Sequence, residues 1–221
     1  MSIDGYIDDS SDRRLRLSNE VDAERVDAVR ASCDAILVGA NTIWRDNPRL
    51  LVRSVPRRDE RMSRGLPPSP MKVAVTARGD IDPSLRFFTA GAVEKIVYCT
   101  TPAVAKAEER LGAAATVVDA GDPINLTRLL SDIADRGARR LMVEGGGSIH
   151  TQFLTEGLAD ELQLVISPVF VGDPSAPRFV DGGTFPWRGY GDGIWLAEVR
   201  KIEDLVLLRY ALSSRFEETP C

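Results

Sequence analysis

The sequence predicts an α/β fold: a mostly parallel central sheet with helices on both faces and an antiparallel C-terminal edge. Two observations predict it. Strand-like and helix-like segments alternate along most of the 221 residues, which is typical of strand–helix–strand units. The last two strand-like segments, WLAEVRKIE (195–203) and DLVLLRYALS (204–213), follow one another without a helix between them. We therefore expect these two strands to pair antiparallel through a tight turn.

The individual elements follow from apolar spacing and capping residues. Ser18 or Asn19 can cap the first helix, in which Val26, Val29 and Cys33 recur at helical spacing. A short, wholly apolar strand, AILVG, follows at 35–39 and is expected to be buried on both faces. Further strands are predicted at 50–54, 72–77, 95–100, 115–121, 139–145 and 161–172, and further helices at 101–113, 124–137 and 148–158.

Two long segments are expected to be loops. Residues 54–70, SVPRRDERMSRGLPPSP, are rich in proline and charge, which indicates a solvated surface loop. Residues 172–193, rich in glycine and proline, are interpreted as a lid or an oligomer contact.

The composition and the cysteine and histidine content argue against several classes of function. A net charge of −5 argues against a nucleic-acid-binding protein. No apolar run reaches the ~18 residues of a membrane span, and the N-terminus lacks the basic and apolar regions of a secretory signal. Cys33, Cys99 and Cys221 form no C-x-x-C pair, which is typical of a reducing cytoplasm. With His150 as the single histidine, no Cys/His zinc site is expected.

The segment LMVEGGGSIHTQFL (141–154) predicts a phosphate site. A strand ends at Glu144, and Gly145, Gly146 and Gly147 then lead into a helix. Backbone N–H groups at a helix N-terminus suit a phosphate, and glycine permits a close approach. The alternative is a tight strand-to-helix turn without a ligand. The three adjacent glycines also differ from the spaced glycines of a dinucleotide-binding fingerprint.

A second polar cluster lies in AILVGANTIWRDNPRLLVR (35–53). Thr42 and Asp46 follow the strand that ends at Gly39, and Arg53 lies beyond the Asn-Pro turn. Open α/β sheets place ligands at such carboxyl ends of strands, and Arg53 can bind a phosphate bidentately. As single residues, each of these also fits a structural role.

Taken together, MSIDG (1–5), AVRASCDAILVGANTIWRDNPRLLVR (28–53) and LMVEGGGSIHTQFLTEGLADELQLVISPVFVG (141–172) resemble the pyrimidine reductase family of riboflavin biosynthesis. The resemblance covers roughly Met1 to Phe179 and implies a dihydrofolate reductase-like fold. It also implies a single reductase domain over residues 1–221 that reduces a phosphorylated pyrimidine with NADPH. The family's first strand ordinarily precedes MSIDG, so this strand is expected to be missing or truncated before Met1.

The reduction also needs a proton, and Asp4 and Glu144 are the carboxylates available near the inferred cleft, although Asp4 also fits a turn residue before Gly5 and Glu144 also fits a contact with the pyrimidine. The resemblance assigns the binding roles by matching position. His150 fits either a cofactor contact or plain packing. The cofactor-binding residues implied are Thr42, Asp46, Thr76, Arg78, Gly146, Gly147, Ser148, Ile149, His150, Thr151 and Gln152. The substrate-binding residues implied are Arg16, Arg30, Leu50, Arg53 and Glu144.

Arg16 bears on which pyrimidine is reduced. It stands where many bacterial members carry Trp, which is similar to archaeal and fungal relatives that reduce the 2,5-diamino-pyrimidinone. Neither the H-A-E nor the P-C-x-x-C motif of the companion deaminase occurs. Arg30 and Arg53 are expected to clamp the 5-phosphate, since neither has an obvious ion-pair partner in the sequence.

Two other functions remain open at this point. One is a dihydrofolate or pterin reductase on the same fold, and the other is a non-catalytic nucleotide-binding relative. A homodimer is also predicted, because the apolar C-terminal strands would otherwise form an exposed edge.

Overall fold

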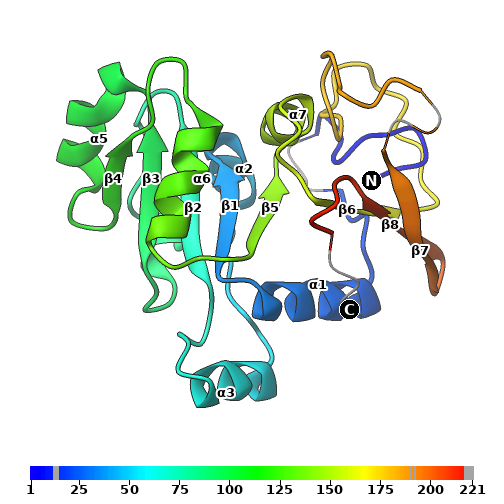
Figure 1. Ribbon diagram of the computed structural model, residues 1–221, viewed down its shortest axis with the longest axis horizontal. Coiled ribbons are helices and arrows are strands. Elements are labelled where there is room, and N and C mark those ends of the chain that lie inside the picture. Colours follow the sequence, from blue (N-terminus) through cyan, green and yellow to red (C-terminus); the bar gives the residue numbers. More distant parts are fainter. Residues whose placement is uncertain (12–14, 190, 192, 217–221) are drawn as a thin grey trace. The chain divides into compact units, whose positions relative to one another are not determined.

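The computed structural model describes residues 1–11, 15–189, 191 and 193–216 (Figure 1). The chain divides into two compact units. One is Val26–Gly146; the other combines Met1–Arg25 with Gly147–Cys221. None of the helices among the described residues is both long and apolar enough to cross a membrane.

The unit 26–146 is built on a five-stranded parallel sheet. Its strands are β1 (Ala35–Gly39), β2 (Met71–Thr76), β3 (Lys95–Cys99), β4 (Thr116–Asp119) and β5 (Leu141–Gly145). Their order across the sheet is β4-β3-β2-β1-β5, and every neighbouring pair is parallel. The chain thus adds strands to one side of β1 and then returns to place β5 on its other side.

The helices of this unit lie before its first strand and in the connections between its strands. They are α1 (Glu20–Ser32), which begins in the other unit, α2 (Ala40–Asp46), α3 (Val55–Ser63), α4 (Arg86–Thr89), η1 (Thr101–Ala103), α5 (Val104–Leu111) and α6 (Leu126–Asp135). Right-handed crossovers place the connections that run from β1 to β4 on one face and α6 on the other. In Figure 1, α6 lies in front of the sheet. The parallel sheet with helices therefore confirms the α/β prediction.

The apolar core explains why the strands lie where the sequence predicts them. All five residues of β1 are buried, as a continuous apolar strand in the middle of a covered sheet requires. Ile36 and Val38 pack with Ala74 of β2 and Val97 of β3 in one cluster. Ile43, Phe87 and Leu111 bring α2, α4 and α5 onto the same cluster.

Residues 50–54 do not form the predicted strand. Their backbone groups bond to side chains instead of a neighbouring strand: the N–H of Val52 donates to Ser69 Oγ at 3.0 Å, and the N–H of Ser54 donates to Asp27 Oδ2 at 3.1 Å. Leu50 adopts a φ of 47°, which is incompatible with an extended ladder. The apolar residues at 50–52 therefore reflect packing into the core rather than a strand.

The segment 54–70 is likewise not a plain loop, because its first part forms α3. Pro56 lies in the first turn, where the missing N–H costs no hydrogen bond. Arg61 is buried, and its guanidinium donates to the carbonyls of Ala31 and Cys33, both at 2.7 Å. The buried Arg61 therefore attaches α3 to the backbone at residues 31–33. The composition of α3 is nevertheless that of a solvated segment.

The second unit contains a three-stranded antiparallel sheet. Its strands β6 (Glu161–Ile166), β7 (Trp195–Ile202) and β8 (Leu205–Ala211) have the order β6-β8-β7, so the antiparallel C-terminal strands form a sheet of their own. The tight turn between β7 and β8 is confirmed, with Glu203 at a φ of 55°. The unit also contains α7 (Gly147–Thr155) and the N-terminal segment, where Ser2 pairs with Ser167. Asn19 accepts the N–H of Asp22 at 2.9 Å and so caps α1, as predicted.

Lys72 is a fully buried ammonium on β2. It donates to the carbonyls of Phe87 at 2.9 Å and Ala90 at 2.6 Å, at the C-terminal end of α4. Burial lowers the pKa of Lys72 from 10.5 to about 8, and the positive charge of Lys95 adds to this effect.

We predict that Lys72 makes stability depend on pH between about 8 and 10.5. In this window the unfolded chain holds a proton that the folded chain has released, so the free energy of unfolding rises with pH. Lys72→Met should remove a rise on the order of 3 kcal/mol. Urea unfolding at several pH values measures it. Cys33 and Tyr98 also titrate at alkaline pH, and they do so in both proteins. The contribution of Lys72 is therefore the difference in the free energy of unfolding between wild type and variant at each pH. Parallel curves for wild type and variant would contradict the prediction.

Candidate functional site

The switch point of the parallel sheet lies between β1 and β5. From β1 the chain leads to β2 on one side, and β5 enters on the other. Open α/β sheets bind ligands outside the carboxyl ends of the strands at such a point. Here β1 ends at Gly39 and β5 ends at Gly145, and a Cβ added to Gly146 would lie 3.2 Å from Thr42 Oγ1. The fold thus brings together Thr42 and Gly146, two of the expected cofactor residues from distant parts of the sequence.

The three adjacent glycines serve three different purposes. Gly145 has a φ of 147°, a conformation that other residues rarely adopt. Gly146 permits the close approach of Thr42. In the other unit, a Cβ on Gly147 would lie only 2.4 Å from the carbonyl oxygen of Arg178. Glycine at position 147 is therefore explained by packing, the alternative that the sequence left open.

Residues 148–152 form the first turns of α7, and several of them hold the segment 178–181. Thr151 Oγ1 accepts the N–H of Asp181 at 2.7 Å, and Ser148 Oγ lies 3.4 Å from Asp181 Oδ2. His150 Nδ1 lies 3.2 Å from the carbonyl oxygen of Phe179, with the two rings 5.3 Å apart. Ile149 is buried and Gln152 is half-buried on the same helix. These contacts support the packing interpretation of His150.

Arg30 and Glu144 form a close ion pair. The Arg30 Nη2 donates to Glu144 Oε2 at 2.7 Å and its Nε donates to Oε1, so the contact is bidentate. Arg30 lies in the last turn of α1 and Glu144 lies one residue before the end of β5. The sequence shows no obvious ion-pair partner for Arg30, and the fold supplies one from 114 positions away.

Arg53 also has a carboxylate partner that the sequence did not reveal. Its backbone N–H donates to Asp27 Oδ1 at 2.5 Å, and its Nε lies 3.7 Å from the same oxygen. Burial opposes ionisation of Asp27, but bonds from the N–H groups of Arg53 and Ser54 and from Arg57 together hold its pKa below the usual value. The signal for Asp27 was available: it lies one helical turn before Arg30, on the same side of α1.

Leu50 is placed differently from the other expected substrate residues. Its side chain is only 2% exposed and belongs to the apolar cluster between the sheet and its helices. The structure therefore supports a packing role for this side chain.

Thr76 and Arg78 form a turn after β2. The buried Thr76 hydroxyl accepts the N–H groups of Arg78 and Gly79, both at 3.2 Å, so Thr76 shapes the turn. The exposed Arg78 guanidinium lies 5.6 Å from the ring centroid of Trp44 and 3.7 Å from an oxygen of Asp80. Trp44 lies on α2, two residues before the half-buried Asp46. The sequence reasoning missed Trp44, although it lies between Thr42 and Asp46.

Asp4 and Arg16 belong to the other unit and make local contacts. The carboxylate of Asp4 accepts from Ser2 Oγ at 2.6 Å and from the N–H of Gly172 at 2.8 Å. These bonds, that of Ser2 foremost, lower the pKa of Asp4, which is the opposite of what a general acid needs. The structure thus favours the turn residue over the catalytic acid. Arg16 is exposed and pairs with Glu20 at 2.7 Å.

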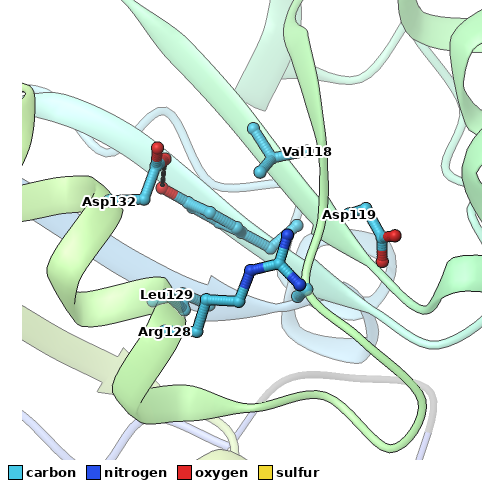
Figure 2. Close-up of a pocket in the computed structure, with 7 residues that line it drawn as sticks. Val118, Asp119, Arg128, Leu129 and Asp132 are labelled. Atoms are coloured by element: carbon cyan, nitrogen blue, oxygen red, sulfur yellow. Dashed lines mark hydrogen bonds between the residues drawn. The ribbon is translucent and has the colours of Figure 1, made fainter.

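A cavity of about 70 Å³ lies between α6 and the carboxyl ends of β3 and β4, as Figure 2 shows. The Tyr98 hydroxyl donates to Asp132 at 2.5 Å, and Arg136 lies 2.8 Å from the same oxygen. Ligand sites usually enclose about 300–1,000 Å³. The cavity is therefore too small for a nucleotide, and it lies at the far side of the sheet from the switch point. Its lining residues are Tyr98, Val118, Asp119, Ala120, Arg128, Leu129 and Asp132.

Comparison with known proteins identifies the family. Residues 1–203 match the family model of the RibD C-terminal domain. The chain belongs to the RibD C-terminal domain family. Within it, 184 residues are 35% identical to the 2,5-diamino-6-ribosylamino-4(3H)-pyrimidinone 5′-phosphate reductase of Archaeoglobus fulgidus, covering 83% of this chain and 84% of that one. The riboflavin biosynthesis protein RibD of Bacillus amyloliquefaciens is 30% identical, covering 74% of this chain and 43% of the relative.

Solved structures show the same fold. A pyrimidine reductase-like protein from Corynebacterium diphtheriae superposes with a TM-score of 0.79 at 22% identity, covering 95% of this chain and 88% of that one. The riboflavin biosynthesis reductase Rib7 of Saccharomyces cerevisiae gives a TM-score of 0.69 at 18% identity, covering 96% and 86%. These likenesses confirm the expected dihydrofolate reductase-like fold.

We predict that Gly147→Ala destabilises the protein, because the new methyl group would overlap the carbonyl oxygen of Arg178. Overpacking of this kind costs about 1–3 kcal/mol. Gly182→Ala is the matched control, since a Cβ there meets nothing within 4 Å. Urea unfolding should show the control within about 0.5 kcal/mol of wild type. Equal stability of the two variants would contradict this account of Gly147.

Proposed function

We propose that the chain is an NADPH-dependent reductase of riboflavin biosynthesis. It would convert 2,5-diamino-6-ribosylamino-4(3H)-pyrimidinone 5′-phosphate to the ribitylamino compound. The choice of substrate rests on one observation. Relatives of that name from Archaeoglobus fulgidus and Methanothermobacter thermautotrophicus are 35% and 32% identical and cover 83% and 82% of the chain. We further propose a single reductase domain over residues 1–221.

The ion pair of Arg30 and Glu144 supports a pyrimidine substrate that carries an amino group. Arg30 uses one bond to each carboxylate oxygen of Glu144, and a carboxylate has about four acceptor positions. Glu144 can therefore still accept from an amino group of the pyrimidine while Arg30 fixes its direction. The deaminated ring keeps its 5-amino group, so this contact supports an amino-pyrimidine of either kind, and the choice between the two rests on the named relatives. In this proposal Glu144 binds substrate and Arg30 positions Glu144.

The residues at the switch point fit a nicotinamide dinucleotide, which supplies the hydride when bound. Thr42 offers a hydroxyl beside the side-chain-free backbone of Gly146. Arg78 offers an exposed cation next to the Trp44 ring, which suits a phosphate near an adenosine. The full proposed cofactor set is Thr42, Asp46, Thr76, Arg78, Gly146, Gly147, Ser148, Ile149, His150, Thr151 and Gln152. Asp4 is left out of the catalytic set, because its oxygens hold the backbone at Gly172.

Substrate turnover tests the proposal directly. The diamino-pyrimidinone phosphate and its deaminated counterpart are supplied separately with NADPH, and oxidation is followed at the nicotinamide absorbance band. We expect a higher kcat/KM for the diamino compound. Oxidation with neither compound, in a protein that binds NADPH, would favour a non-catalytic relative. Preference for the deaminated ring would overturn the choice of substrate.

We predict that Arg78 contributes to a preference for NADPH over NADH. Arg78→Ala should lower kcat/KM with NADPH by roughly ten- to a hundredfold, because a charge-assisted contact to the 2′-phosphate is lost. The value with NADH should change little. Arg139→Ala, on an exposed arginine just before β5 at the opposite end of the strands, serves as the charge control. Equal use of NADPH and NADH by the wild-type protein would refute the preference itself.

A homodimer through the antiparallel sheet is part of the proposal. β7 is an edge strand of this sheet, and it exposes Trp195, Leu196 and Val199, the last with 59% of its surface accessible. An open apolar edge favours pairing with another strand, and a second copy of the chain offers the same edge.

We predict a species of twice the single-chain mass at micromolar concentration in sedimentation equilibrium. Val199→Lys should shift it toward the monomer, because an edge lysine opposes strand pairing. Lys201→Ala, at an exposed position of the same strand, should leave the mass unchanged. A monomeric wild-type protein under these conditions would refute the dimer.

A further inference from the structure

We propose that Trp44 and Asp80 set, in opposite directions, how strongly the chain distinguishes a 2′-phosphate from a 2′-hydroxyl on a bound adenosine nucleotide. Both act through Arg78, whose guanidinium lies beside each of them. The inference rests on the proposed cofactor role of Arg78. It concerns two positioning residues to which the family resemblance assigns no role.

The backbone of the turn that carries Arg78 is fixed independently of the arginine side chain. Thr100 Oγ1, from the end of the neighbouring strand, donates to the carbonyl oxygen of Ala77 at 2.7 Å. Gly79 has a φ of 62°, and a Cβ on it would lie only 2.9 Å from a backbone oxygen of η1. These contacts determine where the Cα of Arg78 lies, so the direction of its side chain depends on other groups.

The side chain of Arg78 has two close neighbours. Its guanidinium carbon lies 5.6 Å from the centroid of the Trp44 ring, and its Nε lies 3.7 Å from Asp80 Oδ2. Neither contact is a hydrogen bond, and the guanidinium makes none with any residue that the structure describes. Because 69% of this side chain is exposed, weak contacts are enough to decide its direction.

Trp44 holds the guanidinium in a form that can bind a phosphate. It lies on α2, which begins directly after β1, and β1 pairs with β2 in parallel. The helix and the turn after β2 therefore lie at the same end of the sheet. An aromatic ring attracts a cation electrostatically and accepts no conventional hydrogen bond from it. The N–H donors of Arg78 thus stay available for a bidentate contact with a phosphate.

Asp80 acts in the opposite direction. Its Oδ2 lies 3.7 Å from Arg78 Nε and 4.0 Å from Lys106 Nζ, so one carboxylate attracts two cations. Its Oδ1 is buried and accepts no hydrogen bond from the part of the chain that the structure describes. A 2′-phosphate would bring a second negative charge to the same cations, and the two anions repel. A 2′-hydroxyl carries no charge and can donate to a carboxylate.

The binding of two nucleotides, without any pyrimidine, measures the effect. Adenosine 2′,5′-bisphosphate and adenosine 5′-monophosphate differ only in the 2′-phosphate, and calorimetric titration gives the ratio of their affinities. We expect Trp44→Ala to lower this preference for the bisphosphate roughly two- to fivefold, the range of an exposed cation–π contact. Trp44→Phe should retain most of it, because a ring face remains. Asp80→Asn should raise it roughly two- to fivefold, and more at low salt than at high salt.

Matched variants separate these effects from a general loss of structure. Met62→Ala removes a large exposed side chain from α3, and Asp135→Asn removes a carboxylate from the exposed end of α6. Both should leave the ratio unchanged, and thermal melting verifies that every variant is folded. In an Arg78→Ala background, Trp44→Ala should have no further effect on the ratio, because the ring acts through Arg78.

The outcomes distinguish this inference from the proposed reaction. A wild-type ratio in a folded Trp44→Ala or Asp80→Asn variant would overturn the inference and leave the proposed reaction intact. Equal weakening of both nucleotides by Trp44→Ala would also overturn it, because the ring would then contact the adenosine itself. So would equal affinity of the unmodified protein for the two nucleotides. If the ratios shift as expected but neither pyrimidine is reduced, the proposed reaction fails and the inference stands.

Discussion

The pairing of β1 with β5 is the constraint on which the site in residues 26–146 depends. β1 is buried over its whole length and is hydrogen-bonded to β2 on one side and to β5 on the other. Because β5 enters beside β1 rather than beside β4, the end of β5 meets the start of α2. Thr42 then lies against Gly146, and Glu144 lies within reach of Arg30. Loss of this single pairing would separate residues that the sequence places about a hundred positions apart.

Charge in this unit is organised around two buried or half-buried carboxylates. Glu144 holds Arg30 through a bidentate contact, and Asp27 holds the backbone at 53–54 together with the side chains of Arg53 and Arg57. The side chains of Arg30 and Glu144 are both mostly buried, so removing Glu144 should cost more than the loss of an exposed ion pair. The contacts with these carboxylates thus restrict the orientations of the arginine side chains.

The unit that contains α7 is organised by its own backbone contacts. The carbonyl of Arg178 lies where a side chain on residue 147 would be, and Thr151 and His150 bind the segment that follows. The segment 172–189 is thus attached to α7 at 178–181. The sequence could not show this, because glycine, threonine and histidine fit a ligand site and a packing contact equally well.

Local sequence determined the strands of the parallel sheet, the capping of α1 at Asn19 and the turn between β7 and β8, because apolar period, capping side chains and turn chemistry act over a few residues. It also determined the family, since three motifs in a fixed order are specific even where each one is ambiguous. Tertiary structure alone decided the rest. It placed Leu50 in the core, made α3 out of a charged, proline-containing segment, and gave Arg30 and Arg53 their carboxylate partners. The physical reason is the same in each case. Burial and charge pairing depend on which distant residues the order of the strands brings together, and this order cannot be read from hydrophobic periodicity or from residue propensity.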